Sequence, residues 1–124
     1  MGRFVILEHV GSPRSGGAPH WDLMFEAGEA LMTWALASRP VAHTAIEAER
    51  LADHRLAYLE YEGPVSGDRG VVTRWDQGEY ELLESSDALF TARLKGSKLM
   101  GVARLERASE SAQRYVFTFL PNSG

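Results

Sequence analysis

Two side chains that could ligate a metal alternate with apolar residues between positions 20 and 26. His20 and Asp22 are two residues apart on an expected strand, so both side chains project from the same face. An imidazole and a carboxylate are a common ligand pair for divalent metals. His9 ends the preceding expected strand, and a loop over residues 11–19 could fold back and bring it beside His20. Two histidines and a carboxylate leave open coordination positions, as a catalytic metal requires; the alternative is a solvated polar pair.

A second candidate segment contains Asp53, His54 and, four residues further on, Tyr58. We expect His54 at the end of a helix, where it could act as a general acid or donate a hydrogen bond to a phosphate oxygen, oriented by Asp53. A structural role at the helix terminus is the alternative for His54, and core packing is the alternative for Tyr58. His43 is expected to be a surface or capping residue.

Short apolar–polar alternations separated by glycine and proline turns dominate the chain, and they predict a mainly β protein. We expect an antiparallel β-barrel of six to eight strands. Residues 44–53 differ: apolar residues fall near helical spacing and Thr44 with Glu47 forms a capping box, which predicts one short flanking α-helix. Asp76-Gln77-Gly78 is expected to be a turn. The strands are predicted at Arg3–His9, His20–Glu26, Glu29–Leu36, Val71–Trp75, Glu79–Leu83, Leu89–Leu94, Leu99–Leu105 and Arg114–Leu120.

Length and charge limit the class of protein. The 124 residues fit a single domain over 1–124, with an ordered core expected at residues 3–120, and the absence of cysteine excludes disulfides and thiolate metal sites. The net charge of −4 argues against a protein that coats nucleic acid but permits a site for one strand end. No apolar run is long enough to span a bilayer. We therefore expect a soluble, cytoplasmic, monomeric protein with no membrane partner.

Several motifs together resemble a known family, the 3′-phosphoesterase domain of bacterial and archaeal DNA ligase D, which heals strand ends in non-homologous end joining. The motifs are Phe4–His9 (FVILEH), His20–Glu26 (HWDLMFE), Asp53–Gly63 (DHRLAYLEYEG), Gly70–Gly78 (GVVTRWDQG) and Leu94–Gly101 (LKGSKLMG). Their order covers residues 3–105, and the chain looks most like the small stand-alone members of the family.

The resemblance implies a β-barrel enzyme that uses manganese or another divalent transition metal to remove a 3′-phosphate or a 3′-terminal ribonucleotide in DNA end repair. The family's metal ligands fall at His9, His20 and Asp22 of this chain. Its active-site histidine and tyrosine fall at His54 and Tyr58, and the histidine also contacts the phosphate. The implied partners are nucleic-acid 3′ ends and a separately encoded ligase or polymerase.

Two family positions that carry phosphate-binding cations differ here. An arginine two residues after the motif aspartate is replaced by Met24, and a lysine position holds Ser38, followed by Arg39. We predict that Arg39 and Arg14 contact the phosphate. Arginines in nearby loops could substitute for the missing cation: Arg14, Arg55 and Arg69.

The altered cation set keeps two further hypotheses open. In one, the chain is a catalytically weakened family member that serves as a binding module for a nucleic-acid end or for a protein. In the other, it is a small β-barrel without any role on nucleic acid, as its acidic charge would allow.

Overall fold

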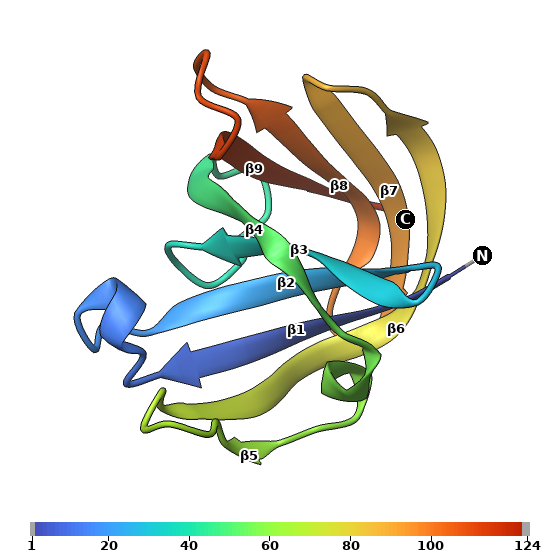
Figure 1. Cartoon of the computed structure of the whole chain (residues 1–124). Helices are drawn as coiled ribbons and strands as arrows, with labels where there is room; N and C mark the ends of the chain where they lie inside the picture. Colours follow the sequence, from blue (N-terminus) through green and yellow to red (C-terminus); the bar gives the residue numbers. More distant parts are fainter. Residues whose placement is uncertain (1, 123–124) are drawn as a thin grey trace.

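Eight antiparallel strands close into a barrel in the computed structural model, which describes residues 2–122 (Figure 1). The order around the ring is β1-β2-β3-β4-β9-β8-β7-β6, and β6 pairs again with β1. The ring strands are β1 (Gly2–Val10), β2 (His20–Ala27), β3 (Ala30–Leu36), β4 (Ile46–Arg55), β6 (Val71–Ser85), β7 (Leu89–Gly96), β8 (Met100–Arg107) and β9 (Arg114–Pro121). The expected mainly β barrel of six to eight strands is confirmed. The ends of the predicted domain, residues 1 and 123–124, lie outside the described residues.

A short segment lies outside the barrel and positions the site described below. This outer segment, residues 56–70, contains the 3-10 turn η2 (Leu56–Leu59) and the two-residue strand β5 (Gly63–Pro64), which pairs with β6. A second 3-10 turn, η1 (Pro13–Ser15), lies in the loop between β1 and β2. Within residues 2–122, no helix is long and apolar enough to cross a membrane.

The uninterrupted apolar run of β1 follows from burial of both its faces. Phe4 and Ile6 belong to the cluster that fills the barrel, where aromatic rings pack at centroid distances such as 4.8 Å between Phe25 and Phe90. Val5 and Leu7 point to the outer face. They belong to a second cluster that also contains Met24, Leu31, Leu59, Val65 and Val72, with Leu56 and Tyr58 packed against it. The outer segment is therefore fixed to the barrel by apolar contacts over β1 and β2.

The alternation in β2 decides which side chains stay outside the barrel. Trp21, Leu23 and Phe25 join the barrel cluster. Between them, His20, Asp22 and Met24 are directed to the opposite face, since successive side chains of a strand alternate. The polar residues of this strand thus lie under the outer segment and not in the barrel interior.

The predicted α-helix over residues 44–53 is wrong, because residues Ile46–Arg55 form β4. Ile46 and Ala48 are buried while Glu47 and Glu49 are exposed, which is the two-residue period of a strand. β4 pairs with β3 on one side and β9 on the other, so without it the barrel would stay open. The free energy gained by closing the sheet overrides the helical preference of these alanines and glutamates.

The predicted turn at Asp76-Gln77-Gly78 is also wrong, because β6 continues through it while changing partner from β1 to β7. Gly78 is needed for close packing and not for a turn: an added Cβ would lie 2.0 Å from the carbonyl oxygen of Lys95. The buried Asp76 carboxylate accepts hydrogen bonds from four backbone N–H groups, those of Gln77, Ser97, Lys98 and Leu99, at 2.8–3.0 Å. It thereby fixes the turn between β7 and β8.

Replacing this carboxylate should destabilise the barrel. In Asp76→Ala, backbone N–H groups lose their charged acceptor, and we expect a loss of about 2–4 kcal/mol in the free energy of unfolding. Urea denaturation of the variant against wild type measures it. Asp87→Ala, which removes an exposed carboxylate from the turn before β7, is the matched control. Equal stability of the two variants would contradict this role for Asp76.

Candidate functional site

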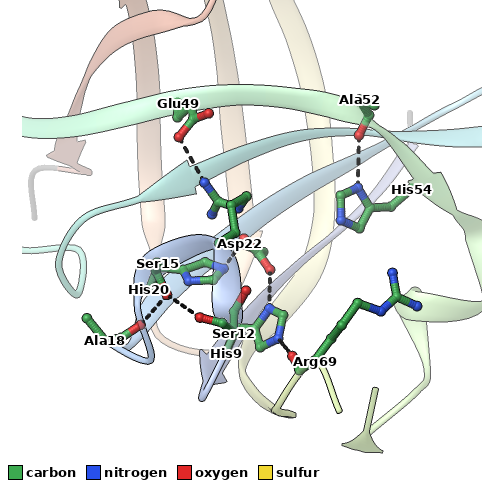
Figure 2. A network of polar contacts seen from close by, with 11 residues as sticks. His9, Ser12, Ser15, Ala18, His20, Asp22, Glu49, Ala52, His54 and Arg69 are labelled. Atoms are coloured by element: carbon green, nitrogen blue, oxygen red, sulfur yellow. Dashed lines mark hydrogen bonds and ion pairs between the residues drawn. The ribbon is translucent and has the colours of Figure 1, made fainter. Parts of the chain in front are cut away.

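Pairing of β1 with β2 brings the three predicted metal ligands together. His9 lies opposite His20, and Leu7 lies opposite Asp22, in the antiparallel register. The Nδ1 atom of His9 is 3.3 Å from Oδ2 of Asp22, and Nε2 of His20 is 3.2 Å from Oδ1 (Figure 2). One ligand atom from each residue lies within 4.8 Å of the other two. The loop over residues 11–19 does fold back, as its glycines allow.

The hydrogen bonding of His9 directs one ring nitrogen at the carboxylate. Its Nε2 donates a hydrogen bond to the carbonyl oxygen of Arg69, 2.6 Å away. Because that oxygen can only accept, Nδ1 is left without a proton in the neutral ring and faces the Asp22 carboxylate. Repulsion between these two electron pairs is relieved either by a proton or by a metal ion. Metal-bound histidines usually donate their second N–H to a carbonyl in this way.

Asp22 is a fixed negative charge at the centre of the cluster. Burial alone would raise its pKa, but the close polar contact with His20 and the hydrogen bond with His9 lower the pKa to about 2. The same hydrogen bond with Asp22 raises the pKa of His9 above its ordinary value of 6.5, against the opposing effect of burial. The carboxylate therefore stays ionised near neutral pH and attracts a cation to the position between the rings.

Two buried polar atoms of the cluster have no hydrogen-bond partner among the described residues. They are Nδ1 of His20 and Oδ1 of Asp22, in residues that are only 5% and 2% exposed. Nε2 of His20 lies 3.2 Å from this Oδ1 but without the alignment of a hydrogen bond. Leaving such atoms unpaired costs about 1–3 kcal/mol each, so proteins rarely retain them without a ligand. Together with the ionised Asp22 and the orientation of His9, they fit a divalent ion held by two imidazoles and one carboxylate.

His54 and Tyr58 line the same cavity as the three predicted ligands. The cavity has a volume of about 460 Å³ and lies between the outer face of the barrel, the end of β4 and the outer segment. The ring nitrogen Nδ1 of His54 donates to the carbonyl oxygen of Ala52 at 2.9 Å, and the His54 and Tyr58 rings are 5.8 Å apart in an edge-to-face arrangement. His54 therefore keeps Nε2 for a bound group. It stands at a strand end and not at the predicted helix end.

The predicted phosphate-binding arginines take different positions. Arg14 lines the cavity, where its Nη1 atom is 2.8 Å from Oε1 of Glu49. Arg39 is not among the cavity-lining residues; its guanidinium lies 5.9 Å from the centroid of the Trp21 ring. Arg55 and Arg69 also line the cavity, and so does the apolar side chain of Met24.

The residue types gave no indication of two contributors to the site. The carbonyl group of Arg69 orients His9, and any amino acid could supply it, so its role depends on the fold alone. Ser12 is buried at the cavity wall, and its carbonyl oxygen accepts backbone hydrogen bonds from Ser15 and Gly17 that shape the loop before His20. The one signal in the sequence is Pro13, which directly follows Ser12 and begins η1.

Comparison with known proteins agrees with the site geometry. Residues 13–107 match the model of the DNA ligase D 3′-phosphoesterase domain family. The chain is 32% identical, over 118 aligned residues, to the multifunctional non-homologous end joining DNA repair protein LigD of Mycobacterium tuberculosis and to its counterpart in Mycobacterium bovis. The alignment covers 86% of this chain but 14% of each relative, so the chain corresponds to a small part of those proteins. On these grounds the chain belongs to the DNA ligase D 3′-phosphoesterase domain family.

Proposed function

We propose that this protein is a metal-dependent phosphoesterase that acts on 3′ ends of nucleic acid in DNA end repair, removing a 3′-phosphate or a 3′-terminal ribonucleotide. The observation that carries the proposal is the position of His54 and Tyr58 in one cavity with His9, His20 and Asp22. Family membership supports a role in processing 3′ ends during non-homologous end joining. A separate ligase or polymerase would act on the healed end.

We assign different chemical roles to the residues of the cavity. His9, His20 and Asp22 would hold a divalent ion, with manganese as the proposed metal, and such an ion polarises a phosphoryl oxygen and activates water. Nε2 of His54 is free to donate a proton to a phosphate oxygen or to a leaving oxygen when the ring is protonated. Tyr58 lines the same space, and its hydroxyl would donate a hydrogen bond to the same phosphate.

A second candidate function has a specific observation in its favour. Met24 lies at the cavity wall two residues after Asp22 and is 1% exposed, so this position offers a bound phosphate neither a charge nor a hydrogen-bond donor. A thioether cannot stabilise the charge that develops during phosphoryl transfer. A protein that binds strand ends or a partner protein without rapid turnover would show this feature. Manganese calorimetry and a gel-shift assay with end-labelled DNA would then detect binding in the absence of product.

The enzymatic proposal predicts a pattern of activities. With manganese and a primer carrying a 3′-phosphate or a 3′-ribonucleotide, wild type should form a dephosphorylated or shortened product on a sequencing gel. His20→Ala should reduce the rate to the level seen with a chelator, because a metal ligand is lost. His54→Ala should lower the rate by about 10²–10⁴-fold through loss of the acid–base group.

The control for these histidine variants is His43→Asn, which changes an exposed histidine outside the cavity at φ +60°, a conformation that asparagine tolerates. This variant should retain the wild-type rate. If wild type forms no more product than His20→Ala, the protein is not a phosphoesterase on these ends.

Manganese affinity should depend on pH with a defined sign. Below its raised pKa, His9 carries a proton on Nδ1 that the metal must displace, so affinity should fall about tenfold per pH unit for each displaced proton. Above that pKa the His9 ring is neutral, so His9 no longer makes the manganese affinity depend on pH. Asp22, with a pKa of about 2, stays ionised and adds no pH dependence between pH 5 and 8.

Calorimetric titrations with manganese across this pH range measure the effect. Asp22→Asn should abolish binding, whereas the exposed Asp87→Asn should leave it unchanged. An affinity that rises as the pH falls would rule out His9 as a ligand.

A further inference from the structure

The loop at residues 65–70, between β5 and β6, is held firmly against the end of β1. The N–H of Val65 donates to the carbonyl oxygen of Gly70 at 2.8 Å, which closes the loop. Gly70 has a φ of +91°, and a Cβ there would lie 2.1 Å from the carbonyl oxygen of Val10. The backbone of this loop therefore packs directly on the strand that carries His9, with no room for a side chain between them.

The same loop delivers Arg69 to the cavity. Its carbonyl oxygen accepts the hydrogen bond from His9, and its side chain lines the cavity with His54 and Tyr58. Figure 2 shows the guanidinium extending from the His9 side of the site toward His54. Arg69 thus contacts the proposed metal ligand His9 through its backbone and faces the cavity with its side chain.

The guanidinium of Arg69 is oriented by neutral partners. Its Nε donates to the carbonyl oxygen of Ser66 at 2.7 Å, and its Nη2 donates to the hydroxyl of Ser66 at 3.1 Å. Neither acceptor carries a charge, and no carboxylate is paired with Arg69 among the described residues. The side chain is held in place while its positive charge remains available to an anion.

The other two arginines of the cavity differ in this respect. Arg14 is paired with the Glu49 carboxylate at 2.8 Å, which offsets its charge. Arg55 is exposed, and within residues 2–122 no hydrogen bond fixes its guanidinium. Arg69 alone combines a fixed guanidinium with an unpaired charge among the described arginines of this cavity.

We propose that Arg69 is the phosphate-binding cation of this site, contacting a non-bridging phosphate oxygen with the N–H groups that Ser66 leaves free. The inference rests on the proposed function, because it assigns the anion contact of the same cavity. A guanidinium is suited to this task, since its planar donors form charge-assisted hydrogen bonds with phosphate. Arg69 supplies a charge on the cavity wall that Met24 does not.

Binding of inorganic phosphate tests the proposal without relying on turnover. Calorimetry with wild type should detect phosphate binding, and Arg69→Ala should weaken it about tenfold, as expected for the loss of one charge-assisted contact. Arg69→Lys should retain part of the affinity. Manganese affinity should be unchanged in Arg69→Ala, because the carbonyl group that orients His9 remains.

Two further variants separate a binding role from a structural one. Arg93→Ala removes an exposed arginine that pairs with Glu81, and it should bind phosphate like wild type. Ser66→Ala removes the hydroxyl that orients the guanidinium and should give an intermediate loss. The proposal is overturned if Arg69→Ala binds phosphate as tightly as wild type, or if wild type binds none. Arg69-dependent phosphate binding without turnover on primers would refute the enzymatic proposal and leave this one standing.

Discussion

β1 is hydrogen-bonded on both edges and buried on both faces, and the rest of the structure depends on this. Its pairing with β2 and β6 closes the barrel. Its inner face contributes to the barrel core, while its outer face carries the apolar cluster on which the outer segment rests. Its end places His9 opposite His20 and against the backbone at Gly70. One strand thus closes the barrel, supports the outer segment and positions the predicted metal ligands.

The cluster of His9, His20 and Asp22 keeps polar atoms buried without satisfying all of them. Asp22 is buried, ionised and shared by two imidazoles, yet one of its oxygens has no hydrogen-bond partner among the described residues. Two apolar side chains on these strands would pack here at lower cost. The other buried aspartate, Asp76, differs from Asp22 in this respect. Each of its carboxylate oxygens accepts a hydrogen bond from at least one backbone N–H, and the carboxylate fixes a turn. The difference separates a carboxylate that fixes a turn from one that the proposed function assigns to metal binding.

The sequence predicts much of this arrangement where the strand period is clear. The alternation in residues 20–26 correctly separates barrel side chains from outer ones, and the mainly β barrel follows from the many short alternating segments. Residues 44–53 could not be assigned in this way, because alanine and glutamate prefer a helix and only barrel closure makes the segment a strand. The orientation of His9 by the Arg69 carbonyl has no signal in residue types, because it depends on backbone packing at Gly70.

The location of the cavity on the outside of the barrel separates two kinds of sequence change. The barrel core is built from inner-facing residues such as Phe25, Trp34 and Phe90, none of which lines the cavity. The far wall of the cavity comes from the outer segment, which makes few of the barrel's hydrogen bonds. Side chains of the outer segment that line the cavity but lie outside the second apolar cluster, such as Arg69, can therefore change, by mutation or in a selection experiment, while the barrel core stays constant. Under the proposed function, changes of substrate specificity would then be separable from changes of thermal stability.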